Sequence, residues 1–211
     1  MADNTTNNKT NTFLGLSKGH LIIIVAVAVF IIWLMSGYNG LVSKDETVTQ
    51  AWADVQTDYQ RRLNLIPTLT KMINKRTKFE KETYEAVALA RSKATQVTIS
   101  ADELTEEKLK QFQAQRGDME AALGKLLAIT ENYPELKADK QFEQFNVQLE
   151  GTENRIKESI QLFNKAVTDY NLNVRRFPGS IVARIFGFDT KPKFEAEAGA
   201  EKMPDVNDFM D

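Results

Sequence analysis

The amino-acid sequence predicts an all-α protein, with a single N-terminal transmembrane helix followed by an antiparallel up-and-down helical bundle. Three observations support this fold class. One long run has no polar side chain, four later segments place apolar residues three and four positions apart, and no segment outside the first run has the alternation of a strand. Amphipathic segments in this order predict a membrane helix that carries a bundle.

The transmembrane helix is predicted over residues 19–42. Its centre, residues 21–35, reads LIIIVAVAVFIIWLM, and no charge occurs between Lys18 and Lys44. About 20 helical residues cross a hydrocarbon core of about 30 Å, so the stretch is long enough. A cleaved signal peptide is the alternative. The long Asn- and Thr-rich segment before the run and the poor cleavage site at Ser36 and Gly37 favour a retained anchor.

Composition argues against several function classes. The chain has 27 basic and 29 acidic residues, a net charge of −2, and therefore lacks the basic excess of a nucleic-acid-binding protein. It has no cysteine, and its only histidine, His20, lies at the membrane edge, which excludes thiolate chemistry, a histidine triad and a His/Cys metal site. We expect no cofactor and no metal. The expected partners are the lipid bilayer, through residues 19–42, and other membrane proteins or a second copy of the chain.

Changes in composition predict four regions. We expect a disordered polar tail over residues 1–18, the transmembrane helix over 19–42, the bundle over 43–188 and a flexible acidic tail over 189–211. This organisation predicts a single-pass membrane protein. Lys9 and Lys18 precede the span and Lys44 follows it, so the charges do not decide on which side of the membrane the bundle lies.

The first bundle helix is predicted from a stripe of apolar residues, in which Arg62 takes one position. Pro67 interrupts the pattern because it lacks an N–H and its ring clashes with the carbonyl of Leu63, so we expect a kink or a break there. The apolar residues of the stripe are Val48, Trp52, Val55, Tyr59, Ile66, Leu69 and Ile73.

Three further helices and one short apolar segment are predicted. Residues 77–80 (TKFE) fit a capping box that opens the second helix. Ser100 and Thr105 are both candidate caps for the third helix, which has Arg116 on its apolar stripe and ends at Tyr133. The fourth helix ends before Pro178. Residues 181–188 (IVARIFGF) then either cap the bundle or lie on the membrane surface or a partner. The apolar stripes are Leu109, Phe112, Met119, Leu123 and Leu126 in the third helix, and Phe142, Phe145, Leu149, Ile156, Ile160, Phe163, Val167, Tyr170 and Val174 in the fourth.

Arg62 defines the candidate site, because a charge on an apolar stripe needs a carboxylate when it is buried. Glu153 near the middle of the fourth helix and Glu80 at the start of the second are the candidate partners, and Arg155 lies beside Glu153. These four residues predict either a buried ion pair that sets the helix register or a site for an anion or phospholipid headgroup. The ion pair is favoured, since setting register is the best-attested role of buried polar groups. No catalytic residue is expected.

Several motifs, in order, resemble those of the LemA family of bacterial membrane proteins. They are YNGLV at 38–42, AW at 51–52, YQRRLNLIPTL at 59–69, ARS at 90–92, LEGTENR at 149–155, VRRFP at 174–178 and FEAEAGAE at 194–201. The resemblance implies a single-span protein with a largely helical soluble domain and no established enzymatic activity. Where the family often has a histidine before Glu80, this chain has Phe79, which excludes histidine chemistry at that point.

These observations lead to two functional hypotheses. The first is a non-enzymatic, membrane-anchored scaffold or interaction module. The alternative is a bundle that binds an anionic ligand or a headgroup in a core pocket lined by Arg62, Glu80 and Glu153, as an enzyme or a carrier would. A cavity of substrate size at these side chains would distinguish the alternative from the scaffold.

Overall fold

The computed structural model describes residues 18–74, 85, 88–89, 92 and 99–195, and within them it confirms the all-α class, without a strand. The elements are α1 (Lys18–Asn74), the 3₁₀ turn η2 (Ala101–Glu103), α3 (Glu106–Glu131), α4 (Pro134–Lys137), α5 (Lys140–Arg175) and α6 (Gly179–Phe186). The predicted second helix, with its capping box at residues 77–80, lies almost entirely outside the described residues.

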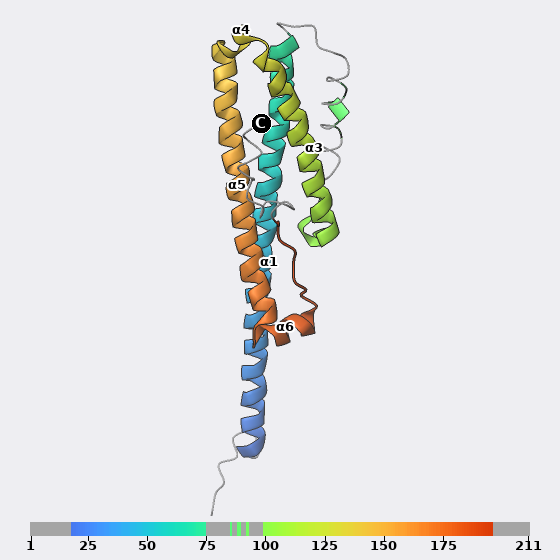
Figure 1. Cartoon of the computed structure of the whole chain (residues 1–211). Helices are drawn as coiled ribbons and strands as arrows, with labels where there is room; N and C mark the ends of the chain where they lie inside the picture. The colour runs from blue at the N-terminus through green and yellow to red at the C-terminus, as the bar shows by residue number, and fades with distance from the viewer. Residues whose placement is uncertain (1–17, 75–84, 86–87, 90–91, 93–98, 196–211) are drawn as a thin grey trace, which may run out of the picture.

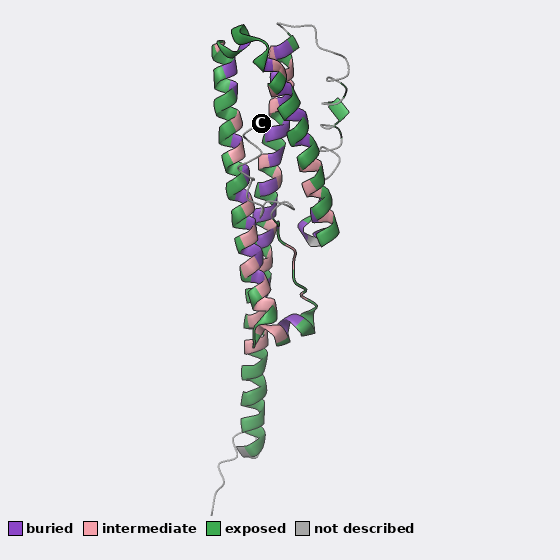
Figure 2. Ribbon diagram, viewed as in Figure 1, coloured by how far each residue is buried: buried purple, intermediate pink, exposed green. Residues whose placement is uncertain are grey.

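Helix α1 is one uninterrupted helix of 57 residues. At 1.5 Å per residue it is about 85 Å long. Its lower end is exposed all round, whereas its upper part lies inside the bundle (Figure 2). The break allowed at Pro67 is absent, because the helix continues through this residue to Asn74. Leu63, Ile66 and Leu69 are all buried around the proline, and this packing holds the turn helical despite the lost hydrogen bond.

The bundle is antiparallel (Figure 1). Helix α3 ends at Glu131, the short α4 turns the chain, and α5 returns along α1. Local sequence explains these boundaries. The Thr105 hydroxyl accepts a hydrogen bond of 3.2 Å from the Lys108 N–H and caps α3, and Pro134 occupies the first turn of α4, where no N–H is needed.

Besides a small cluster of Leu41, Val182 and Ala183, two large hydrophobic cores follow one another along α1. We call them the membrane-proximal and the membrane-distal core, after their distance along α1 from its apolar end. The proximal core contains Val48, Ala51, Trp52, Val55, Tyr59, Ile99, Ala101, Leu104, Leu109, Ile156, Phe163, Ala166, Val167, Tyr170 and Phe194. The distal core contains Leu63, Ile66, Leu69, Ile73, Met119, Ala122, Leu123, Leu126, Leu136, Phe142 and Phe145. The predicted apolar stripe of α1 is therefore confirmed as a core stripe.

The chain beyond α6 differs from the expectation. Residues 189–211 were expected to form a flexible tail, but residues 188–195 return along the bundle, and we call this segment the strap. Its Phe194 side chain is buried in the proximal core. Composition was misleading here because one aromatic side chain can hold a polar segment in place. Residues 196–211 lie outside the described part of the chain.

Candidate functional site

The predicted candidate site lies where the two cores meet. The Arg62 side chain leaves α1 between Tyr59 of the proximal core and Leu63 of the distal core, and only 3% of the residue is exposed. Its Nε lies 2.8 Å from Oε1 of Glu153 on α5, and its Nη2 lies 4.0 Å from Oε2 of Glu120 on α3. The structure thus brings Arg62 and Glu153 together across the bundle, and Arg62 joins three helices.

The polar groups of this cluster are incompletely satisfied. Arg62 Nη1 and the Tyr59 hydroxyl are buried without a hydrogen-bond partner, and Arg62 Nε and Glu153 Oε1 are close but not aligned for a hydrogen bond. A cavity of about 30 Å³ lies beside Tyr59, Arg62 and Arg116. The cavity is lined mainly by apolar surface and has room for about one water molecule.

Burial governs the proton affinities here. Desolvation raises the pKa of Glu153 above its ordinary value, and the Arg62 charge opposes this effect without cancelling it. Burial also raises the pKa of the Tyr59 phenol to about 12, although Arg116 and Arg62 act in the opposite direction. The Glu153 side chain is still 40% exposed, so the carboxylate retains contact with water, whereas the guanidinium does not.

The other predicted site residues are placed differently. Glu80 lies outside the described residues. Arg155 is exposed and lies at a shallow hollow beside Asp58 and Arg61, away from the cavity at Arg62. Sequence reasoning did not place Arg116 and Glu120 in the cluster. The position of Arg116 on the apolar stripe of its helix was the available signal, and Glu120 lies one turn further along the same helix.

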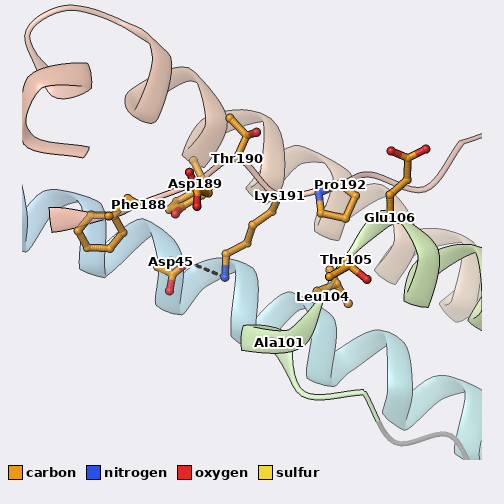
Figure 3. Close-up of a pocket in the computed structure, with 12 residues that line it drawn as sticks. Asp45, Ala101, Leu104, Thr105, Glu106, Phe188, Asp189, Thr190, Lys191 and Pro192 are labelled. Carbon is orange, nitrogen blue, oxygen red and sulfur yellow. Dashed lines mark ion pairs between the residues drawn. The ribbon is translucent and has the colours of Figure 1, made fainter. Parts of the chain in front are cut away.

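A larger pocket, of about 610 Å³, lies under the strap (Figure 3). Lys191 of the strap points across it to α1, where its Nζ is 2.7 Å from Oδ1 of Asp45 and 5.5 Å from the ring centroid of Tyr170. Burial, with the charges of Asp45 and Asp189, raises the pKa of Tyr170 to about 12. Lys191 thus pairs with Asp45, one of the three carboxylates that line the pocket, the others being Glu106 and Asp189.

A third hollow, of about 930 Å³, is an open groove between α1 and α5. Its lining includes the apolar residues Val42, Ala51 and Leu162 and the acidic residues Glu46, Asp54 and Asp169. Within the part of the chain that the structure describes, no three His, Cys, Asp or Glu side chains are grouped in a way that could hold a metal ion.

Comparison with known proteins identifies the family. The LemA family model matches residues 51–209, which include Arg62, Glu120 and Glu153. The chain belongs to the LemA family. Two magnetosome proteins of Paramagnetospirillum magneticum, MamQ 1 and MamQ 2, are each 23% identical over 198 residues, covering 86% of this chain and 73% of each relative. Protein LemA of Metamycoplasma hominis is 26% identical over 165 residues, covering 78% of this chain and 71% of the relative.

The apolar end of α1 lies outside the matched range of the LemA model, which begins at Ala51. Among the described residues, α1 is the one helix long and apolar enough to cross a membrane. Its exposed large apolar residues lie between Leu21 and Val42. Figure 2 shows that most of this end of the helix is exposed. This LemA-family chain is therefore a helical membrane protein.

Proposed function

We propose that this LemA-family protein is a non-enzymatic scaffold, held at a membrane by a single span over residues 19–42, that presents its helical bundle to a membrane protein or to a second copy of the chain. The bundle acts as an interaction module. Its role is to hold a partner at a set distance from the bilayer, and no bond is made or broken.

The continuity of α1 is the observation that carries this proposal. One helix supplies the apolar segment and then residues to both cores, with no linker between them. A continuous helix fixes both the distance of the bundle from the membrane and its orientation, because backbone hydrogen bonds fix the residues of the helix relative to one another. Such coupling suits a scaffold, since a partner bound to the bundle would be positioned relative to the membrane.

The geometry of the Arg62 cluster supports the scaffold over the anionic-ligand alternative. The cavity that touches Arg62 has a volume of about 30 Å³. Pockets for organic ligands have volumes of about 300–1,000 Å³. The guanidinium also has Glu153 and Glu120 as carboxylate neighbours, so an anion would have to replace them. The cluster therefore suits the role of setting the register of α1, α3 and α5.

The proposal is tested by isolating the full-length chain in mild detergents after cross-linking in native membranes. We expect a defined membrane partner or a homo-oligomer. The matched control carries Ile24→Arg and Val27→Arg, which put two charges into the apolar segment at a cost of about 3 kcal/mol each. The control should lose the complex. A monomer without a partner across several detergents would contradict the scaffold role.

A binding measurement addresses the alternative. Titration of the full chain with inorganic phosphate should give no heat that depends on Arg62, so the wild type and Arg62→Met should behave alike. Saturable phosphate binding that Arg62→Met abolishes would favour a bundle that binds an anionic ligand.

A further inference from the structure

Helix α6 has an unusual position at the junction of the bundle and the apolar end of α1 (Figure 1). Val182 and Ala183 are buried against Leu41, together with Trp33 and Leu34 of α1. The Phe186 ring lies 4.8 Å from that of Tyr38. A side chain at Gly37 would bring its Cβ to within 2.9 Å of Val182 Cγ2, so glycine permits this close approach. The depth of α6 relative to α1 is therefore fixed by packing.

The position of the span then determines where α6 lies relative to a bilayer. Counted from Gly19, about 20 residues of helix cross the hydrocarbon core of about 30 Å, which brings the far boundary to about residue 38. The α1 residues that contact α6 lie between Trp33 and Leu41, and they bracket this boundary. A span in this position would place α6 at the level where acyl chains meet headgroups.

The solvent-exposed surface of α6 and of the turn before it has the composition expected at the boundary between acyl chains and headgroups. Ile181 and Ile185 are one helical turn apart and are 41% and 57% exposed, and Phe177 just before the helix is 81% exposed. Arg175, Arg176 and Arg184 are also exposed, and none of them forms an ion pair with another described residue. Residues 175–188 contain no acidic side chain. Apolar side chains beside arginines are the pattern of a helix that lies in a membrane interface.

We propose that α6, together with the end of α5 and the turn before α6, is a second membrane contact. It inserts Phe177, Ile181 and Ile185 among the acyl chains and binds anionic phospholipid headgroups through Arg175, Arg176 and Arg184. The span alone would allow the bundle to tilt and rotate. A second contact beside the span fixes one face of the bundle against the bilayer. This proposal rests on the position of the span and is independent of the scaffold role.

The first test measures depth. The chain has no cysteine, so a single spin label can be placed in the full-length protein by Ile185→Cys, with Val147→Cys on the exposed face of α5 as the matched control. In vesicles that contain phosphatidylglycerol, the label on α6 should collide often with oxygen, which dissolves in the bilayer, and rarely with a water-soluble nickel complex. The control label should show the opposite preference. Equal access of the nickel complex to both labels would overturn the proposal, and protection found only in native membranes would assign the surface to a protein partner instead.

The second test measures headgroup selectivity. Trp33 lies beside α6, whereas Trp52, the other tryptophan, is buried in the proximal core. Quenching of Trp33 by brominated phosphatidylglycerol should exceed quenching by brominated phosphatidylcholine. Because a basic residue near an anionic surface contributes roughly fivefold in affinity, each of Arg175→Gln, Arg176→Gln and Arg184→Gln should lower the preference stepwise. Lys157→Gln and Lys165→Gln on α5 are the matched controls and should leave it unchanged. If the triple variant still preferred phosphatidylglycerol over phosphatidylcholine, the three arginines would not form a headgroup site.

Discussion

The two cores on α1 are built in different ways. The membrane-distal core is formed by helices that follow one another along the chain, and its members recur at the spacing of a helical stripe. The membrane-proximal core also requires Ile99 and Leu104 from the η2 region and Phe194 from the strap. The Arg62 cluster separates the two. The residues of a core made from periodic helices can be predicted from the sequence. The residues that irregular segments add to a core become known only from the structure.

Aromatic rings and side-chain amides complete the proximal core. Phe194 meets Trp52, Phe112 and Phe163 with ring centroids 5.6 to 6.2 Å apart. Asn164 and Asn171 of α5 each donate to one strap carbonyl and accept from the N–H of the same strap residue, at 2.8 to 3.0 Å. Seven helical residues rise about 10.5 Å, and three extended residues span about 10 Å, so the two asparagines match Lys191 and Phe194 in spacing.

The largest expected effect is at the boundary between the cores. Glu153→Leu removes the nearer carboxylate and leaves the guanidinium of Arg62 buried, with only Glu120 at 4.0 Å. We expect a loss of about 3–5 kcal/mol in the free energy of unfolding, measured by denaturant titration of the full chain in detergent. The double variant Arg62→Met with Glu153→Leu should recover most of it. A loss in the double variant as large as in the single one would contradict the role of the unpaired charge.

Phe194→Ala tests whether the strap is part of the proximal core. Removing a buried phenylalanine side chain costs about 3–5 kcal/mol, and we expect the lower end because the strap can relax. Amide hydrogen exchange should increase around Trp52 and Phe163 before it increases around Leu126 of the distal core. Val147→Ala on α5 is the control and should change stability little, because its side chain is 66% exposed. Equal effects of the two substitutions would show that the strap adds nothing to the core.

Arg62→Met should cost less than Glu153→Leu, although Arg62 is the more deeply buried partner. The substitution leaves Glu153, whose side chain is 40% exposed and can be hydrated. We expect a loss of about 1–2 kcal/mol from the same titration, within the range for a hydrogen bond or ion pair whose remaining partner reaches water. The test is which of the two variants loses more free energy of unfolding. A larger loss in Arg62→Met would show that Glu153, and not Arg62, is the charge that is costly to leave unpaired.

The pH dependence of Glu153 is the smallest expected effect. Its pKa is raised above the ordinary value of 4.5, chiefly by burial. The folded state therefore keeps this proton to higher pH than the unfolded state does, so the contribution of Glu153 to stability is fully present below the unfolded pKa and is lost as pH rises through the folded pKa. The stability of the wild type should fall relative to Glu153→Gln over this interval. A relative gain with rising pH would show that Arg62 outweighs desolvation.

Sequence periodicity was sufficient for the fold and for part of the site. The length of the apolar run predicted the membrane helix. Helical spacing predicted the apolar stripes of α1, α3 and α5, and the need to pair a buried charge predicted Arg62 with Glu153 as a candidate partner. The sequence did not predict the burial of Phe194, since the surrounding residues are those of a polar tail. It also allowed a break at Pro67. The helix-breaking effect of proline is a local property of the sequence, whereas the packing around Pro67 depends on residues that are distant in the sequence.

The continuity of α1 is the central claim, since the span, both cores and the depth of α6 depend on it. Spin labels at Ile32→Cys and Gln60→Cys, both at exposed positions of α1, test it in full-length protein in lipid nanodiscs. A continuous helix places the two Cα atoms about 42 Å apart, and double electron–electron resonance should give one narrow distribution near that value. A broad distribution, or a maximum well below it, would show a hinge between membrane and bundle and would contradict the account.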